Sequence, residues 1–227
     1  MENKETHLFF NQHQASSYDE RWINLAPLKE ALHLCLKALF SELPADSRVL
    51  CVGAGTGAEL ISLAQAYPEW NFTVVEPSLD MMNICRQRAE SHGIAPRCSF
   101  HQGYVNTLPG TDLFNAATSI LVSHFIVDTQ ERMAFFSEIA KRLRPGGYLI
   151  NADLASDMSS PEYKSLIDAW IVLHQYAGIT LNVDYLGRDV ALLPTKDIQS
   201  ILVSSGLSNP VLFYQNLLIH AWYSRVE

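Results

Sequence analysis

The sequence has few basic residues for its length. Lysine and arginine number 16 among 227 residues, whereas aspartate and glutamate number 24, which gives a formal net charge of −8. Because lysine and arginine supply most of the affinity for a phosphate backbone, we expect no nucleic-acid partner. The sequence also lacks an apolar run long enough to cross a bilayer and an N-terminal apolar segment typical of signal peptides. We therefore expect no membrane partner and a cytoplasmic location.

Cysteine is scarce as well. The four cysteines, Cys35, Cys51, Cys85 and Cys98, form no Cys-x-x-Cys pair and have no spacing typical of a zinc site. We expect free, buried thiols and no bound metal.

Internal repeats and low-complexity segments are also absent. A chain of this length with 48% hydrophobic residues is expected to form a single domain, residues 1–227.

Apolar segments of strand and helix character alternate along the chain. Their periodicity and their Gly, Pro and Ser boundaries predict strands at 48–52, 72–76, 98–102, 114–122, 148–152, 210–218 and 219–223. The same signals predict a helix from Pro27 to about residue 40 and a second helix that follows Gly57 and ends near residue 66. Further helices are predicted over 78–90, 129–143, 161–177 and 195–206. Strands that alternate with helices of 10 to 15 residues indicate an α/β fold, a parallel sheet with helices on both faces.

A glycine-rich turn follows the first predicted strand. Val49 to Val52 lead into Gly53, Gly55 and Gly57, so no Cβ would separate the backbone N–H groups from a ligand. With Ala58, the turn fits both Gly-x-Gly-x-Gly and Gly-x-Gly-x-x-Ala. The first pattern is found in methyltransferases that use S-adenosylmethionine (SAM), and the second in dinucleotide-binding proteins. The glycines alone do not choose between these cofactors or exclude a simple tight connection.

Glu76 lies 19 residues beyond Gly57, at the predicted tip of the next strand. A carboxylate at that position can accept hydrogen bonds from both hydroxyls of a ribose. NAD and SAM both contain such a ribose. Glu76 therefore supports a nucleoside cofactor without distinguishing the two.

Three segments in this order resemble the class I SAM-dependent methyltransferases of the small-molecule type. They are residues 49–57, Glu76-Pro77-Ser78 with Asp80-Met81, and the Leu-Arg-Pro-Gly-Gly turn at 143–147. The ending from Gly206 to Trp222 is similar to that family's reversed last strand, and residues 10–19 resemble its N-terminal cap. This resemblance favours SAM over NAD.

The resemblance implies a Rossmann-like, doubly wound, seven-stranded sheet with a reversed last strand. Within the single domain it implies a helical cap at 1–46, a cofactor-binding core at 47–153, a helical insertion or lid at 154–194, and a helix with hairpin strands at 195–227. It implies a SAM site in which the glycines lie along the methionine and ribose, Met81 lies on the adenine, and Ser119 and Ile120 lie beside the methionine. The implied cofactor-binding residues are Tyr18, Gly53, Ala54, Gly55, Gly57, Glu76, Pro77, Met81, Tyr104, Val105, Ser119 and Ile120.

The sequence departs from the family pattern at three positions. Cys51 and Asn115 stand where acidic residues are usual, and Tyr104 stands where an aspartate commonly contacts the adenine amino group. Cys51 leaves open how the cofactor's ammonium end is held. Tyr104 could border the adenine but supplies no carboxylate.

The resemblance implies methyl transfer to an O, N or C nucleophile of a small organic acceptor. For a hydroxyl acceptor, His124 just beyond the fourth strand is the best-placed general base, although a structural loop histidine explains it equally well. Asp153, at the end of the fifth strand, is expected to face the same cleft. Tyr18 and Trp22 could close over the cofactor from the N-terminal cap. Residues that could wall the acceptor pocket are Tyr163, Trp170, His174, Tyr176 and Tyr185, although the helical spacing favours simple packing for Trp170.

Two other functions remain open from the sequence. One is a reaction on the cofactor itself, as in carboxy-SAM synthase, for which Arg21, Arg86, Arg88 and Arg188 could bind a carboxyl group. The other is a non-catalytic SAM-binding protein. The sequence also leaves open a homodimer.

Overall fold

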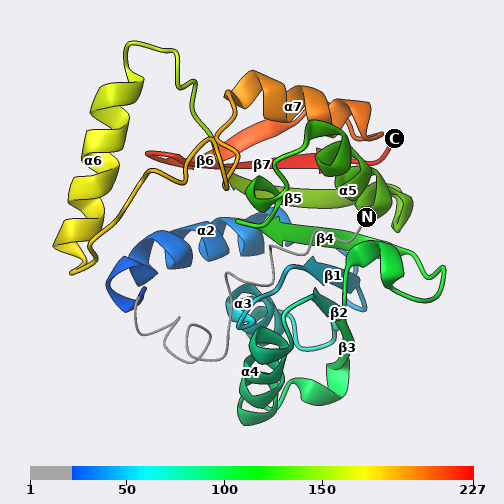
Figure 1. Cartoon of the computed structure of the whole chain (residues 1–227). Helices are drawn as coiled ribbons and strands as arrows, with labels where there is room; N and C mark the ends of the chain where they lie inside the picture. The colour runs from blue at the N-terminus through cyan, green and yellow to red at the C-terminus, as the bar shows by residue number, and fades with distance from the viewer. Residues whose placement is uncertain (1–21) are drawn as a thin grey trace.

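A seven-stranded mixed sheet organises the chain, as the computed structural model of residues 22–227 shows (Figure 1). The strand order is β3-β2-β1-β4-β5-β7-β6; β1 to β5 run parallel, and β7 runs antiparallel to both β5 and β6. This confirms the predicted α/β fold with a reversed last strand. The strands are β1 (Arg48–Val52), β2 (Asn71–Glu76), β3 (Cys98–Gln102), β4 (Phe114–Ile120), β5 (Leu143–Leu154), β6 (Val211–Asn216) and β7 (Ile219–Arg225).

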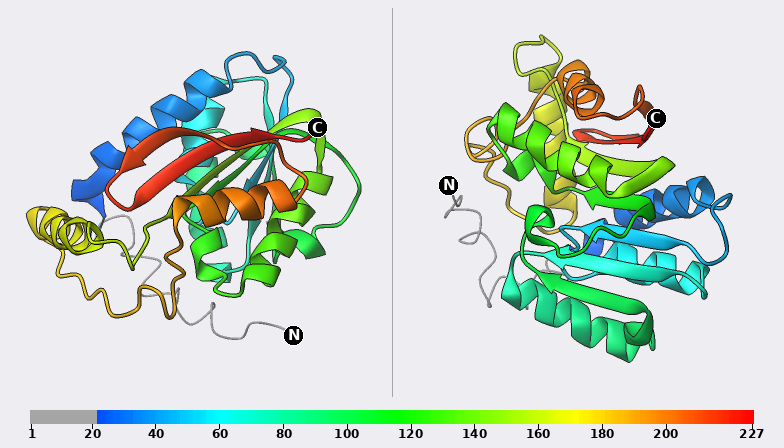
Figure 2. Two further views of the ribbon diagram at one scale, coloured as in Figure 1. Left: turned by 90° about the horizontal axis from the view of Figure 1, so that it is seen from above. Right: turned by 90° about the vertical axis from the view of Figure 1, so that its right-hand side faces the viewer.

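Helices cover both faces of the sheet. One core cluster joins α2, α3 and α4 to the sheet, and a second joins α5 and α7 to its other face. Figure 2 shows α2 and α7 on opposite sides of the β6–β7 hairpin. The helices are α2 (Ala26–Leu39), α3 (Ala58–Ala66), α4 (Leu79–Ser91), α5 (Thr129–Lys141), α6 (Tyr163–Tyr176) and α7 (Thr195–Ser204).

Side-chain caps fix the start of the helices that follow β2 and β4. Ser78 Oγ accepts a hydrogen bond from the Met81 N–H at 3.3 Å, as a serine N-cap predicts. Asp128 Oδ1 accepts from the N–H groups of Gln130 and Glu131 at 2.8 and 2.9 Å. Both helices therefore begin at the edge of the sheet where parallel strands end.

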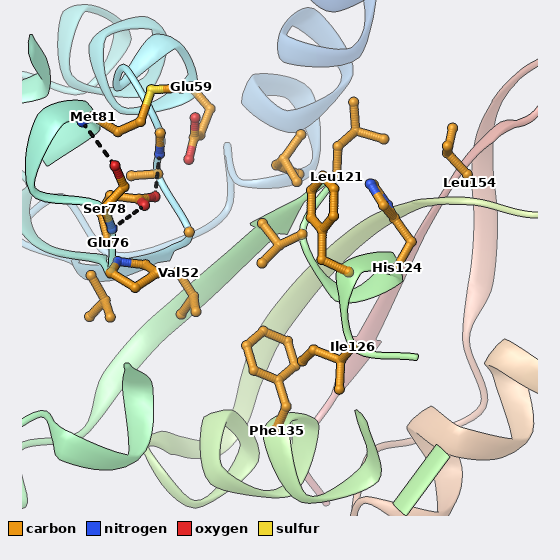
Figure 3. Close-up of a pocket in the computed structure, with 18 of the residues that line it drawn as sticks. Val52, Glu59, Glu76, Ser78, Met81, Leu121, His124, Ile126, Phe135 and Leu154 are labelled. Atoms are coloured by element: carbon orange, nitrogen blue, oxygen red, sulfur yellow. Dashed lines mark hydrogen bonds between the residues drawn. The ribbon is translucent and has the colours of Figure 1, made fainter. Parts of the chain in front are cut away.

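The fourth and fifth strands differ from the predicted boundaries. β4 ends at Ile120 rather than at 122, because Leu121 turns the chain with a φ of +58°, a conformation that leucine rarely adopts. β5 begins at Leu143 rather than at 148, because the Gly146 N–H donates to the Val226 carbonyl at 2.8 Å and extends the pairing. The strained Leu121 lies at the carboxyl edge of the sheet, beside His124 (Figure 3).

The segment from α6 to residue 194 packs over the carboxyl ends of the strands. A third apolar cluster joins Trp170, Leu186, Val190 and Leu192 to Leu154 and Leu218. Residues 179–194 contain no named helix or strand and are held by isolated bridges, including Ala155 with Leu193. This segment therefore forms one wall above the sheet.

The four cysteines are free, with Cys51 and Cys85 buried and Cys35 and Cys98 half-buried. The expectation of buried thiols is thus correct for two of the four. Within residues 22–227, none of the helices combines the length and apolarity needed to cross a bilayer.

Candidate functional site

A cavity of about 1410 Å³ opens at the carboxyl ends of β1, β2 and β4. Its lining comes from α2, the glycine turn, residues 103–107, residues 120–126, α5, α6 and the 181–190 segment. Sites for a single small ligand usually measure about 300–1,000 Å³, so this cavity has room for two. Figure 3 shows carboxylates and a serine at one end and apolar side chains around His124 at the other.

Glycine is required at both ends of the glycine turn, because a side chain at either end would clash with a different neighbour. A Cβ on Gly53 would lie 2.5 Å from Val122 Cγ2, and a Cβ on Gly57 would lie 2.6 Å from Cys85 Sγ. A Cβ on Gly55 would meet no atom within 4 Å. Gly53, Ala54 and Gly55 line the cavity, whereas Gly57 lies outside its lining and lets α4 pack closely against the start of α3.

Glu76 is a buried carboxylate at the tip of β2, with only 6% of the residue exposed. Its Oε2 accepts the Gly55 N–H at 2.9 Å and its Oε1 accepts the Ser78 N–H at 2.9 Å (Figure 3). Burial raises the pKa of Glu76, and the two backbone hydrogen bonds oppose that shift. Each carboxylate oxygen keeps a further lone pair, so the residue can still receive the two hydroxyls of a ribose.

Most of the other expected cofactor residues lie on the cavity wall. Ser119 does not: its side chain is fully buried and lies outside the lining. Tyr18 falls outside the described residues. Those that line the cavity are Pro77, Met81, Tyr104, Val105 and Ile120.

Of the three residues that depart from the family pattern, Tyr104 lines the cavity and Cys51 lies near the cavity residue Glu59. Tyr104 lines the cavity and is 39% exposed. The Cys51 thiol is buried, and burial together with the nearby Glu59 carboxyl raises its pKa well above the usual range. Asn115 lies at the start of β4, where its Oδ1 accepts the Arg48 N–H at 2.9 Å. Asn115 therefore lies at the opposite end of its strand from the cavity.

Glu59, in the first turn of α3, is a cavity residue that the sequence did not single out. It is 6% exposed, and Figure 3 shows its carboxylate directed into the cavity near Met81 and Glu76. Burial raises its pKa to about 7, an effect that its own backbone N–H and Lys29 oppose. A glutamate in the first turn of a helix is ordinarily a solvated group that complements the helix dipole, so nothing in the pattern marked it.

His124 lies in the short turn after β4, with its ring in the apolar part of the cavity (Figure 3). Its Nδ1 is 3.0 Å from Asp153 Oδ1, and its backbone N–H donates to the same oxygen at 2.9 Å. These two contacts fix both the backbone and the ring of His124.

Asp153 does not face the cavity, contrary to the expectation from topology. Its carboxylate is fully buried and lies outside the cavity lining, because it points toward Arg132 on α5. Arg132 Nη2 donates to Oδ2 at 2.9 Å, Asn151 Nδ2 donates to the same oxygen at 3.0 Å, and Ser123 Oγ also donates to it.

The charge state of Asp153 follows from these contacts. Burial would raise its pKa, but the Arg132 charge and the hydrogen bonds from His124 and Ser123 outweigh that effect and hold the pKa well below its usual range. Asp153 is therefore ionised and can only accept hydrogen bonds. It follows that Nδ1 of His124 carries a proton, and in the neutral ring Nε2 is the acceptor. Arg132 was also missed from the sequence, because a buried arginine looks like an exposed one in a helical pattern.

Some of the residues expected to close over the cofactor or to wall the acceptor pocket line the cavity. Trp22, Trp170, His174 and Tyr185 line the cavity, whereas Tyr163 and Tyr176 do not, and Tyr176 is 89% exposed. The Trp22 and His174 rings meet edge to face with centroids 5.6 Å apart. The cap and the insertion thus meet over one side of the cavity.

Comparison with known proteins identifies related sequences and folds. A family model described as "Methyltransferase domain" matches residues 49–147. A fatty-acid O-methyltransferase of Mycolicibacterium smegmatis is 31% identical over 138 residues, which are 60% of this chain and 48% of that protein. The chain spans about half the length, or less, of the curated relatives it matches.

Solved structures share the fold at low sequence identity. An O-methyltransferase family protein from Burkholderia thailandensis superposes with a TM-score of 0.64 at 15% identity, over 90% of this chain and 58% of that one. An O-methyltransferase family 2 protein from Planctomyces limnophilus, in complex with apigenin, gives 0.64 at 17% identity, over 96% and 62%.

Proposed function

Because the chain contains a class I SAM-dependent methyltransferase domain, we propose that it transfers the methyl group of SAM to an oxygen of a small, largely apolar acceptor. The single observation that carries the proposal is His124, which follows β4, lines a cavity large enough for two ligands and is paired from behind with the buried, ionised Asp153.

The described residues fit SAM as the cofactor. Glu76 offers a buried, backbone-fixed carboxylate for the ribose hydroxyls, and Gly55 leaves the turn open where the cofactor would approach. Met81 offers a polarizable thioether for the adenine face. When bound, SAM supplies a methyl group activated by its sulfonium. The protein then has to hold the acceptor oxygen in line and exclude water.

His124 is proposed to accept the proton of an acceptor hydroxyl. Asp153 keeps the proton on Nδ1, so Nε2 is free to take a second proton as the oxygen becomes nucleophilic. Asp153 also stabilises the imidazolium that results, and Arg132 keeps Asp153 ionised throughout. In this arrangement Asp153 and Arg132 are positioning residues rather than catalytic ones.

The apolar end of the cavity supports an apolar acceptor. Leu121, Ile126, Phe135 and Leu154 surround His124 there, and Trp170 adds an aromatic face. The names of similar proteins point the same way, since one relative is a fatty-acid O-methyltransferase and one structural neighbour holds apigenin. We propose an acceptor with a hydroxyl on an aliphatic or aromatic frame. A carboxylate acceptor would need no base and is therefore a separate outcome of the test.

The test has a cofactor step and an acceptor step. S-Adenosylhomocysteine should raise the melting temperature of the protein, and NAD should not, because a ligand of the native state stabilises it. Glu76→Gln should weaken S-adenosylhomocysteine binding by about 10- to 100-fold, the loss expected for a charged hydrogen bond. SAM with a panel of apolar hydroxy and carboxylic compounds, analysed by mass spectrometry, should then yield a methylated hydroxy compound. Stabilisation by NAD alone would overturn the proposal.

The two other functions have less support from the described residues. Three of the four arginines considered for a reaction on the cofactor, Arg86, Arg88 and Arg188, lie outside the cavity lining, and Arg21 is outside the described residues. A non-catalytic protein has no need of the buried His124–Asp153 pair. In the same experiment, a carboxylated cofactor released from the purified protein would favour the first alternative, and binding without transfer would favour the second. The domain divisions, the homodimer and the cytoplasmic location stay predictions.

A further inference from the structure

Glu59 has a buried carboxylate whose hydrogen bond comes from its own backbone N–H and not from a side chain of residues 22–227. Among residues 22–227, no other side chain forms a hydrogen bond or an ion pair with it, although 94% of the residue is buried. An ionised carboxylate is normally buried only with a cation or several donors, since its desolvation costs several kcal/mol. The structure thus holds an acidic group whose counter-ion is not one of its own described side chains.

The position of Glu59 indicates where that counter-ion would lie. The residue follows the glycine turn by two positions and lines the cavity together with Thr56, Ala58 and Glu76. Figure 3 shows its carboxylate on the same side of the cavity as Glu76 and Met81, directed into the open space. If Glu76 holds the ribose of a ligand, the part of that ligand that lies along the glycine turn would therefore come close to Glu59.

The charges around Glu59 limit the nature of the ligand group. Lys29 on α2 also lines the cavity and is half-buried, and it forms no ion pair within 4.0 Å among residues 22–227. Glu59 and Lys29 thus present a negative and a positive group to the same space. An amino-acid group, with one ammonium and one carboxylate, complements that pair.

We infer that Glu59 binds the ammonium group of the amino-acid end of the cofactor, with Lys29 facing its carboxylate. This inference rests on the proposed use of SAM. Glu59 on α3 would then supply the negative charge that the uncharged thiol of Cys51 on β1 does not supply. The Glu59 carboxyl is near enough to Cys51 to raise the pKa of its thiol, so the two side chains share one neighbourhood.

Binding by Glu59 requires its ionised form, which makes cofactor affinity depend on pH. Its pKa of about 7 means that the free protein holds a proton there below neutrality, and an ammonium ligand would displace that proton. His33 on α2 stays neutral in this range, because burial and the two neighbouring lysines lower its pKa to about 4. The other titratable groups around Glu59 are Lys29 on α2, Glu76 on β2, Cys51 on β1, and Cys85 and Arg88 on α4.

Calorimetric titration with two ligands tests this inference. The ligands are S-adenosylhomocysteine and its deaminated analogue, in which a hydrogen replaces the ammonium. The wild-type protein should bind the first about 10- to 100-fold more tightly, and Glu59→Gln should remove that preference. The control Glu90→Gln makes the same charge change on an exposed site of α4 and should behave as wild type. Wild-type affinity for S-adenosylhomocysteine should rise about 10- to 30-fold from pH 5.5 to 8, with proton release, and that of Glu59→Gln should not.

The outcomes separate the inference from the proposed function. An equal loss of affinity for both ligands in Glu59→Gln would indicate a structural role and overturn the inference. A wild-type protein that does not distinguish the two ligands would overturn it without any substitution. If S-adenosylhomocysteine binds and Glu76→Gln weakens it while Glu59→Gln does not, the inference alone fails. If neither ligand binds the wild type, the proposed function fails and the inference with it.

Discussion

His124 Nδ1 lies 3.0 Å from Asp153 Oδ1, and the His124 backbone N–H donates to that same oxygen at 2.9 Å. One buried carboxylate oxygen therefore sets both the position of the turn after β4 and the tautomer of the ring. The other oxygen receives Arg132, Asn151 and Ser123.

Replacing His124 by alanine should lower kcat for a hydroxyl acceptor by about 10²- to 10⁴-fold, because a positioned general base contributes that much. S-Adenosylhomocysteine affinity should stay unchanged, since His124 lies among the apolar side chains and away from Glu76 (Figure 3). Steady-state rates and calorimetry check the two quantities. His92→Ala, an exposed histidine at the end of α4, is the control. Full activity of the His124 variant would rule out a general-base role.

Replacing Arg132 by methionine should destabilise the protein by about 3–5 kcal/mol, because it leaves the Asp153 carboxylate buried without its cation. Adding Asp153→Asn to that variant should restore much of the stability but not the activity, because the uncharged amide no longer supports the His124 imidazolium. Urea unfolding and initial rates separate these effects. A double variant no more stable than Arg132→Met would show that the charge pair is not the reason for the loss.

Glu59→Gln should stabilise the ligand-free protein at pH 8 but not at pH 5. The folded-state pKa of about 7 lies above the ordinary value of 4.5, so the folded protein binds more protons than the unfolded one between these values. Stability is therefore lost as the pH rises through this window, by up to about 3 kcal/mol, and the glutamine variant avoids that loss. Urea unfolding at both pH values measures it. Equal stability of the two proteins at pH 8 would show that the carboxylate is paired.

Gly53→Ala should destabilise the protein more than Gly55→Ala. Both glycines have positive φ, +67° and +54°, so each substitution carries about 1–2 kcal/mol of backbone strain. Only at Gly53 would the new methyl group also collide with Val122, which adds about 1–3 kcal/mol. In a Val122→Ala background the cost of Gly53→Ala should fall toward that of Gly55→Ala. Thermal unfolding of the four variants measures the coupling, and additive effects would contradict the steric explanation.

The order of elements could be predicted because each step relied on a local signal. Glycine turns, apolar strands and caps such as Ser78 depend on neighbouring residues, and these predicted the sheet and placed Glu76 at a strand tip. The predicted ends of the strands were less accurate than the predicted order of the elements. The positive φ of Leu121 and the pairing of Gly146 with Val226 both depend on contacts distant in sequence.

The site residues divide in the same way. Glu76 and His124 were found because they directly follow strands, where ligands of α/β sheets bind. Asp153 also follows this rule by position, but Arg132 turns its carboxylate away from the cavity. Glu59 and Arg132 were missed because a charged residue in a helix is usually exposed, and only the packing of α3 and α5 shows that these two are buried.

The most direct test of the proposed function follows the methyl group itself. Wild-type protein and His124→Ala would be incubated with SAM that carries a trideuterated methyl group and with the apolar hydroxy compounds. Mass spectrometry and NMR would then locate the label. We predict that the wild type places the intact trideuterated methyl on the hydroxyl oxygen and that His124→Ala does so at least about 100-fold more slowly. Label on nitrogen or carbon, or the same rate in both proteins, would contradict O-methyl transfer with His124 as the base.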